Sequence, residues 1–162
     1  ADVRFPASAR GRGRIYQIDP TFAREMESHD LSRATRTDLE FRLFCSDIFF
    51  KVDGESLDAR WSWVPVVGFA GQLFDAAVAA AGGTTPADLE FTENQEKIRF
   101  RLVANRLVLE PTYSAARPAL DSSQFLVATR EFLRKVTSDI ATKCPAIEES
   151  AAFQAIAQKA AS

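Results

Sequence analysis

Residues 38–81 read DLEFRLFCSDIFFKVDGESLDARWSWVPVVGFAGQLFDAAVAAA, and this stretch decides the fold. In its first half apolar and polar residues alternate, which is the period of a half-buried strand. The expected strands are residues 39–43, 48–52 and 57–61. Ser46-Asp47 predicts a turn after the first run, and Asp53-Gly54 predicts a tight hairpin after the second, because glycine accepts a positive φ.

The second half of this stretch has the period of a buried helix. Pro65 suits the first helical turn, where its missing N–H is not needed, and Gly82-Gly83 predicts the helix end. The apolar positions at helical spacing are Val67, Ala70, Phe74, Ala77, Val78 and Ala81. Gly68 and Gly71 inside the helix each cost about 1 kcal/mol relative to alanine. We therefore expect these glycines to allow a close approach of the helix backbone to the sheet.

Residues 89–159 follow the same plan of strands and then helices. Strands are expected at 89–92, 97–102 and 107–113, with turns at 93–96 and Ala104-Asn105. Asp121 and Gln124 have the spacing of a capping box, so a helix should begin there. Its apolar stripe is Phe125, Thr129, Phe132, Leu133, Val136 and Ile140. Pro145 ends that helix, and a short helix follows at 148–159.

These elements predict an α+β fold. Strands joined by tight turns pair antiparallel, and helices with one apolar stripe cover a sheet face. The expected architecture is one antiparallel sheet of about five to six strands with two main helices packed on one face. Residues 38–162 form a single domain in this interpretation. Residues 1–37 form a flexible, Arg-rich leader, with an edge strand near Ile15–Ile18 and a loop or weak helical turn at 23–36.

Composition and charge exclude some classes of function. The net charge of −2 gives no strong field over the whole chain, although residues 1–37 hold seven arginines against five acidic residues. No apolar run is long enough to cross a membrane, and no signal peptide is visible, so a cytoplasmic location is expected. Cys45 and Cys144 are expected to be reduced, buried thiols rather than a disulfide framework.

Residues suited to catalysis are sparse. His29 is the single histidine and lies in a polar segment, so it is expected at the surface. The cysteines and His29 lack the spacing of a metal site, and no glycine-rich phosphate loop is present. The dense carboxylate groups are Asp53 with Asp58, and Glu90 with Glu93 and Glu96. Acids at strand ends and turns are usually solvated, so no catalytic residue, metal or cofactor is predicted.

Binding residues are easier to propose. Trp61 and Trp63 lie two residues apart and so share one face of a strand, where they either pack in the core or form an aromatic patch. Acids in the neighbouring turns could meet a basic partner and steer its association. The candidate partner-binding residues are Glu55, Asp58, Trp63, Glu93 and Glu96.

A basic sheet face supports an alternative. Lys97, Arg99 and Arg101 alternate along one strand, and Arg42 and Lys51 are expected opposite them. Together with the Arg-rich leader, this face would suit weak binding of nucleic acid. A third interpretation is a small-ligand or hydrolase domain with a pocket between sheet and helix.

Three motifs carry a resemblance to a known family. Val52-Asp53-Gly54, the run Arg60–Pro65 (RWSWVP) and Phe91-Thr92-Glu93 resemble segments of small bacterial immunity-like proteins of polymorphic or contact-dependent toxin systems. The closing segment from Phe132-Leu133 to Cys144-Pro145-Ala146 is similar to their ends. The resemblance covers residues 38–157. It implies a non-enzymatic inhibitor that binds one cognate toxin domain, and it implies no catalytic residues.

Overall fold

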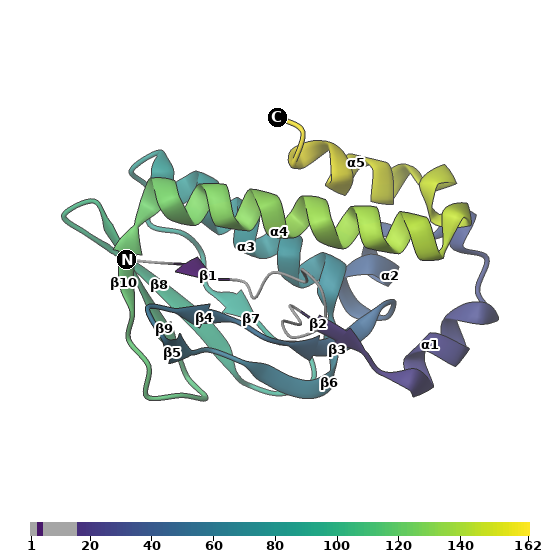
Figure 1. Ribbon diagram of the computed structural model, residues 1–162, viewed down its shortest axis with the longest axis horizontal. Coiled ribbons are helices and arrows are strands. Elements are labelled where there is room, and N and C mark those ends of the chain that lie inside the picture. The colour runs from purple at the N-terminus through teal and green to yellow at the C-terminus, as the bar shows by residue number, and fades with distance from the viewer. Residues whose placement is uncertain (1–2, 5–15) are drawn as a thin grey trace.

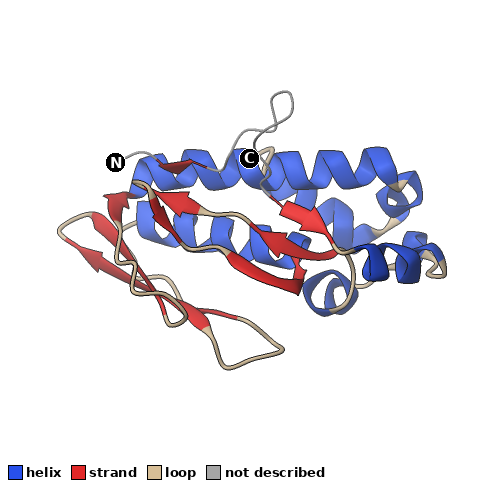
Figure 2. Cartoon of the chain, turned by 60° about the horizontal axis from the view of Figure 1, so that its bottom comes forward, coloured by secondary structure: helices blue, strands red, loops and turns tan. Residues whose placement is uncertain are grey.

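The computed structural model describes residues 3–4 and 16–162 of the chain. Of the leader expected to be flexible, residues 1–37, residues 1–2 and 5–15 lie outside this range. Two long helices, α3 (Val66–Ala81) and α4 (Ser122–Lys143), lie side by side and cover the strands from one side (Figure 1). Figure 2 shows the resulting separation of a helical layer from the strands. The α+β class and the two main helices on one side are confirmed.

The strands within the described range form three antiparallel sheets, so the expected single sheet of five to six strands is wrong. The first sheet contains, in order, β1 (Val3–Arg4), β4 (Lys51–Val52) and β5 (Glu55–Ser56). The second contains β2 (Tyr16–Ile18), β3 (Cys45–Ile48) and β6 (Ala59–Pro65). The third contains β10 (Ala119–Asp121), β9 (Arg106–Pro111), β8 (Lys97–Val103) and β7 (Leu89–Glu90).

The division has a physical reason at the edges of two sheets. β6 ends the second sheet and β7 ends the third, and a single sheet would require these two edges to pair. Aromatic contacts connect them in place of backbone hydrogen bonds. Trp61 of β6 meets Phe91, which follows β7, and Tyr113, which follows β9, with ring centroids 5.0 Å apart in both pairs.

Residues 36–41 form a helix, α2 (Arg36–Phe41), where alternation predicted a strand. The local cap explains the difference. Thr35 Oγ1 accepts a hydrogen bond from the Asp38 backbone N–H, and the Asp38 carboxylate accepts one from the Thr35 N–H. This reciprocal capping box satisfies two backbone donors at the helix start. Leu39 is then fully buried, while Phe41 is exposed.

The polar segment after β2 also folds differently from the expected loop. It forms α1 (Pro20–Glu27) and then a short 3₁₀ helix, η1 (Leu31–Arg33). Asp19 caps α1 by accepting from the Thr21 N–H at 2.8 Å, and Pro20 occupies the first turn. Met26 is the buried residue of α1, and the Phe44 N–H points to its sulfur at 3.2 Å.

Two hairpin turns are confirmed. Asp53 and Gly54 have φ of 51° and 81° between β4 and β5, and Ala104 and Asn105 have φ of 48° and 63° between β8 and β9. Positive φ at both central residues is the geometry that two-residue hairpins favour. The turn expected at Ser46-Asp47 is wrong, because both residues belong to β3.

The buried stripe expected on α4 is confirmed at all six positions, and Asp121 caps this helix as expected. The stripe expected on α3 is confirmed only in part, since Val78 and Ala81 are exposed. The close approach expected at Gly68 is made to a helix rather than to the sheet. A Cβ at Gly68 would lie 2.8 Å from the Glu40 Cα in α2.

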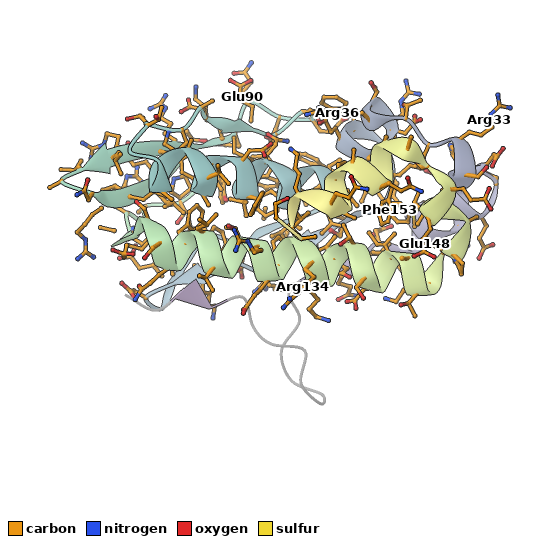
Figure 3. The ribbon with its side chains drawn as sticks, turned by 90° about the horizontal axis from the view of Figure 1, so that it is seen from above. Arg33, Arg36, Glu90, Arg134, Glu148 and Phe153 are labelled. Carbon is orange, nitrogen blue, oxygen red and sulfur yellow. The ribbon has the colours of Figure 1, made fainter. Side chains whose placement is uncertain are left out.

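The C-terminal part closes the fold over both main helices. A 3₁₀ helix, η2 (Pro145–Glu149), leads into α5 (Ala151–Lys159), where Phe153 and Ile156 are buried as expected. Figure 3 shows α5, with Phe153, between α4 and α2. Ser150 caps α5 and also donates from Oγ to the Ala34 carbonyl at 2.7 Å. This bond fixes η2 next to η1.

Candidate functional site

A bulge in β6 determines how Trp61 and Trp63 are presented. Ser46 pairs with Val64 and Ile48 pairs with Ala59, so four residues of β6 face the single residue Asp47 of β3. Asp47 Oδ1 accepts a hydrogen bond from the Ser62 N–H at 2.9 Å. Ser62 has a φ of 62°, which is uncommon for a residue with a side chain. The Asp47 carboxylate therefore holds the chain in a strained conformation between the two tryptophans.

The bulge stacks the two indole rings. Their centroids lie 5.3 Å apart with 16° between the planes, and both side chains are half-buried. Phe91 and Tyr113 meet Trp61 edge-on, and the Tyr113 hydroxyl donates to the Leu57 carbonyl at 3.0 Å. We call Trp61, Trp63, Phe91 and Tyr113 the aromatic cluster. Sequence alternation indicated that the tryptophans share a face, but nothing in it identified Tyr113 or the Asp47–Ser62 bond.

Two of the predicted acids lie close to this cluster. The pKa of Tyr113 is raised, mainly by burial and also by the negative charges of Asp58 and Glu96. Glu96 is half-exposed and its carboxylate accepts a hydrogen bond from Thr112 Oγ1, next to Tyr113. Asp58 accepts from the Phe50 N–H at 2.8 Å and pairs with Arg60 at 2.8 Å. The structure thus brings Asp58, Glu96 and the tryptophan pair together.

Of the other two predicted acids, one lies in a strand and one in a turn. Glu55 is exposed in β5, and its carboxylate accepts from the Arg117 N–H at 2.8 Å. Glu93 is exposed in the turn between β7 and β8. Its charge reaches Cys45, whose pKa is raised to about 11, first by burial and then by Glu93 and two further acids.

The basic face expected for nucleic acid is not assembled. Arg42 follows α2, Lys51 lies in the first sheet, and the basic residues of β8 lie in the third. Several of these cations also have acidic partners. Lys97 pairs with Asp88 at 3.1 Å, and Arg101 pairs with Glu110 at 2.8 Å. This arrangement is an ordinary surface of mixed charge, as cross-strand ion pairs usually are. The Arg-rich leader was the other part of that interpretation, and its residues 1–2 and 5–15 lie outside the described residues.

The residues suited to metal binding or nucleophilic chemistry are placed as follows. Cys45 is buried as expected, whereas Cys144 is half-exposed, which corrects that half of the prediction. His29 is exposed as expected. Among residues 3–4 and 16–162, no group of three or more histidine, cysteine or acidic residues is arranged to hold a metal ion. In the same residues, no helix combines the length and apolar character that a membrane crossing requires.

The chain was compared with known proteins in three ways. Comparison with protein-family models, with curated proteins and with solved structures found no match.

Proposed function

We propose that the chain is a non-enzymatic, protein-binding domain of the immunity type, which neutralises a cognate bacterial toxin. The observation that carries the proposal is the stacked pair Trp61 and Trp63, held half-exposed by a strained bulge at the open edge of a sheet. Tryptophan is enriched among the few residues that dominate binding energy at protein interfaces. A cytoplasmic location belongs to this proposal.

The aromatic cluster suits recognition because it is preorganised. Trp61 is fixed by Phe91 and Tyr113 on its edges, and Trp63 lies flat on Trp61. A partner that covers these rings would immobilise few rotatable bonds, which lowers the entropic cost of association. The recess beside Trp63 has a volume of only 20 Å³, so the surface fits a protein better than it fits a small molecule.

Charge around the cluster supports a basic partner. Glu93 is exposed in the turn between β7 and β8 and Glu55 is exposed in β5, while Glu96 and Asp58 lie next to Tyr113. Toxin domains that act on nucleic acid commonly carry basic clefts, and acids at the rim of an interface steer such partners. Asp58 is already held by Phe50 and Arg60, so its contribution is to support the surface.

Two of the motifs behind the family resemblance coincide with this surface. Arg60–Pro65 is the bulged strand itself, and Phe91-Thr92-Glu93 supplies one ring and one acid of its border. Two motifs far apart in the sequence therefore meet at one place on the molecule. This coincidence favours a shared binding role over two unrelated structural roles.

The test begins with the gene neighbourhood. A gene for a large secreted toxin beside this one supplies the partner, and its toxic domain is co-expressed with the chain in a sensitive host. We expect the chain to restore growth and to bind the purified domain. Trp63→Ala should abolish protection while lowering the melting temperature by only about 2–4 °C, the shift that a loss of about 1 kcal/mol gives in a domain of this size. Val103→Ala is the matched control, since Val103 is an exposed apolar residue of β8 that should not affect protection.

Two results would overturn the proposal. The first is a wild-type chain that neither binds nor neutralises the adjacent toxin domain. The second is turnover of a substrate by the purified chain that Asp53→Asn or Asp58→Asn abolishes, because this would make those carboxylates catalytic.

A further inference from the structure

A hollow lies at the opposite end of the helical layer from β10. Figure 1 shows α1 beside the C-terminal end of α4 at the right of the molecule, where η2 begins. A cavity of about 560 Å³ opens between these elements. Cavities of 300–1,000 Å³ are the usual size of small-molecule sites. The aromatic cluster contributes no residue to this cavity, so its function is separate from the proposed one.

The wall of the cavity is apolar. Its apolar residues come from β2, α1, η1, the residue before β3, α4 and η2, and they include Ile18, Ala23, Met26, Leu31, Phe44, Ile140 and Ala146. Phe44 has a φ of 55° although it is a bulky residue buried in the core. Its N–H points to the Met26 sulfur, and its carbonyl accepts from the Val66 N–H at 3.1 Å. Backbone strain of this kind is concentrated at functional sites, and here it lies in the cavity wall.

The polar side of the cavity is rich in hydrogen-bond acceptors. Glu27 and Asp30 are among the lining residues, and Asp30 Oδ1 accepts a hydrogen bond from Ser32 Oγ at 2.6 Å. His29 contributes its ring, and Nδ1 lies 2.8 Å from the Glu25 carbonyl. A carbonyl can only accept, so Nδ1 carries the hydrogen. In the neutral ring, Nε2 is then an acceptor.

Helix ends add to this negative character. α1 ends at Glu27 and α4 ends at Lys143, and both of these residues line the cavity. The C-terminal end of a helix carries partial negative charge and favours a cation. Lys143 is the one cation among the lining residues, and it offsets part of this field.

We propose that this cavity binds a small molecule with an apolar body and a protonated amine. The apolar wall takes the body, and the amine donates hydrogen bonds to Glu27, Asp30 and His29 Nε2. An anion would meet two carboxylates and two helix C-termini. A neutral alcohol would make the same apolar contacts but would lack the attraction between a protonated amine and the carboxylates.

Cys144 provides a direct measurement of occupancy. Its thiol lines the cavity and is half-exposed, while Cys45 is 3% exposed and serves as an internal control. The probes are octylamine, octan-1-ol and octanoate, which share a chain and differ in the head group. The rate of Cys144 alkylation by N-ethylmaleimide, followed by peptide mass spectrometry, reports binding of each probe. The full chain is used throughout.

We expect octylamine to slow alkylation of Cys144 and to bind about tenfold more tightly than octan-1-ol, the scale of a charged hydrogen bond. Octanoate should bind more weakly than either. The proposal is overturned if octylamine gives no protection, or if octanoate binds as tightly as octylamine. Faster alkylation of Cys45 in octylamine would mean that the amine unfolds the protein, which also overturns it.

Variants locate the site. Ala146→Trp should fill the cavity and remove protection of Cys144, whereas Ala155→Trp, at an exposed alanine of α5, should not. Lys143→Gln removes the like charge and should tighten octylamine binding about two- to fivefold. Glu27→Gln with Asp30→Asn should weaken it. Weaker binding of octylamine to Lys143→Gln would overturn the proposal that the amine binds beside Glu27 and Asp30. This test does not depend on whether Ala146→Trp folds.

Discussion

The indole ring of Trp63 stacks on that of Trp61 with 5.3 Å between centroids, and Trp61 in turn packs edge-on against Phe91 and Tyr113. The two tryptophans are therefore unequal. Trp61 connects β6 to segments next to the third sheet, whereas the ring contact of Trp63 is with Trp61. This difference separates the residue that maintains the surface from the residue that a partner would cover.

Trp61→Ala should destabilise the protein much more than Trp63→Ala. Removal of the Trp61 ring breaks three aromatic contacts and should cost about 3 kcal/mol. Removal of the Trp63 ring loses one stacked pair and should cost about 1 kcal/mol. Urea denaturation of both variants measures the difference. Equal losses would show that Trp63 belongs to the core and is not an outer anchor.

Gly68→Ala should destabilise the protein, and Gly71→Ala should not. A Cβ at Gly68 would lie 2.8 Å from the Glu40 Cα, so α2 and α3 would have to separate. At Gly71 the nearest atom is Ile156 Cγ2 at 4.0 Å, which is ordinary contact. Alanine there should gain up to about 1 kcal/mol of helix propensity. Thermal melts of the two variants should therefore shift in opposite directions.

Phe132→Ala should cost about 3–5 kcal/mol, a large part of the stability of a domain of this size. Phe132 is 1% exposed on α4 and packs edge-on against Phe69 of α3, with ring centroids 6.3 Å apart. Val127→Ala, at a residue of the same helix that is 56% exposed, is the control and should change stability by less than about 0.5 kcal/mol. An unchanged melting temperature for Phe132→Ala would contradict the packing of α3 on α4.

Sequence reasoning succeeded where local rules and burial agree. The α4 stripe, the Asp121 cap and the hairpins at Asp53-Gly54 and Ala104-Asn105 follow from periodicity, capping and turn chemistry. It failed at α2, where alternation of apolar residues suggested a strand. The Thr35–Asp38 capping box was present in the sequence and was the signal that decided the outcome.

The remaining failures depend on distant contacts. Between the second and third sheets, Trp61 packs against Phe91 and Tyr113, which are 30 and 52 positions away in the chain. The cavity at the end of α4 brings His29 and Cys144 to one place, and no spacing rule joins them. For the candidate surface, the tryptophan pair could be predicted, but the bulge that exposes it could not.

Acid should weaken the cap of α4. Hydrogen bonds from the Ser123 side chain and from backbone N–H groups at the helix start lower the pKa of Asp121. Because its pKa is lower in the folded state, the carboxylate stabilises the fold at pH values above the unfolded-state pKa of about 4. That contribution is lost as the pH falls through the folded-state pKa. Asp121→Asn retains an acceptor without the charge, so the urea midpoint of this variant should fall less than that of the wild type between about pH 4 and pH 2.

Charge reversal should affect stability differently at the two acids of the β7–β8 turn. We expected both Glu93 and Glu96 to face solvent, but the structure distinguishes them. Glu93 is exposed, so Glu93→Lys should leave the melting temperature unchanged. Glu96 is half-exposed and bonded to Thr112 Oγ1, so Glu96→Lys should cost about 1 kcal/mol.

Both reversals should nevertheless act in the same way on the proposed partner. Acids near the aromatic cluster attract a basic toxin domain over distance, so lysine at either position should slow association and make its rate less dependent on salt. Stopped-flow association with the toxin domain at two ionic strengths measures this. Arg99→Glu, at an exposed residue of β8, is the control for a charge change elsewhere on the surface. If Glu93→Lys left the association rate unchanged at low salt, the turn would not belong to the binding surface, and the search for it would move away from the aromatic cluster.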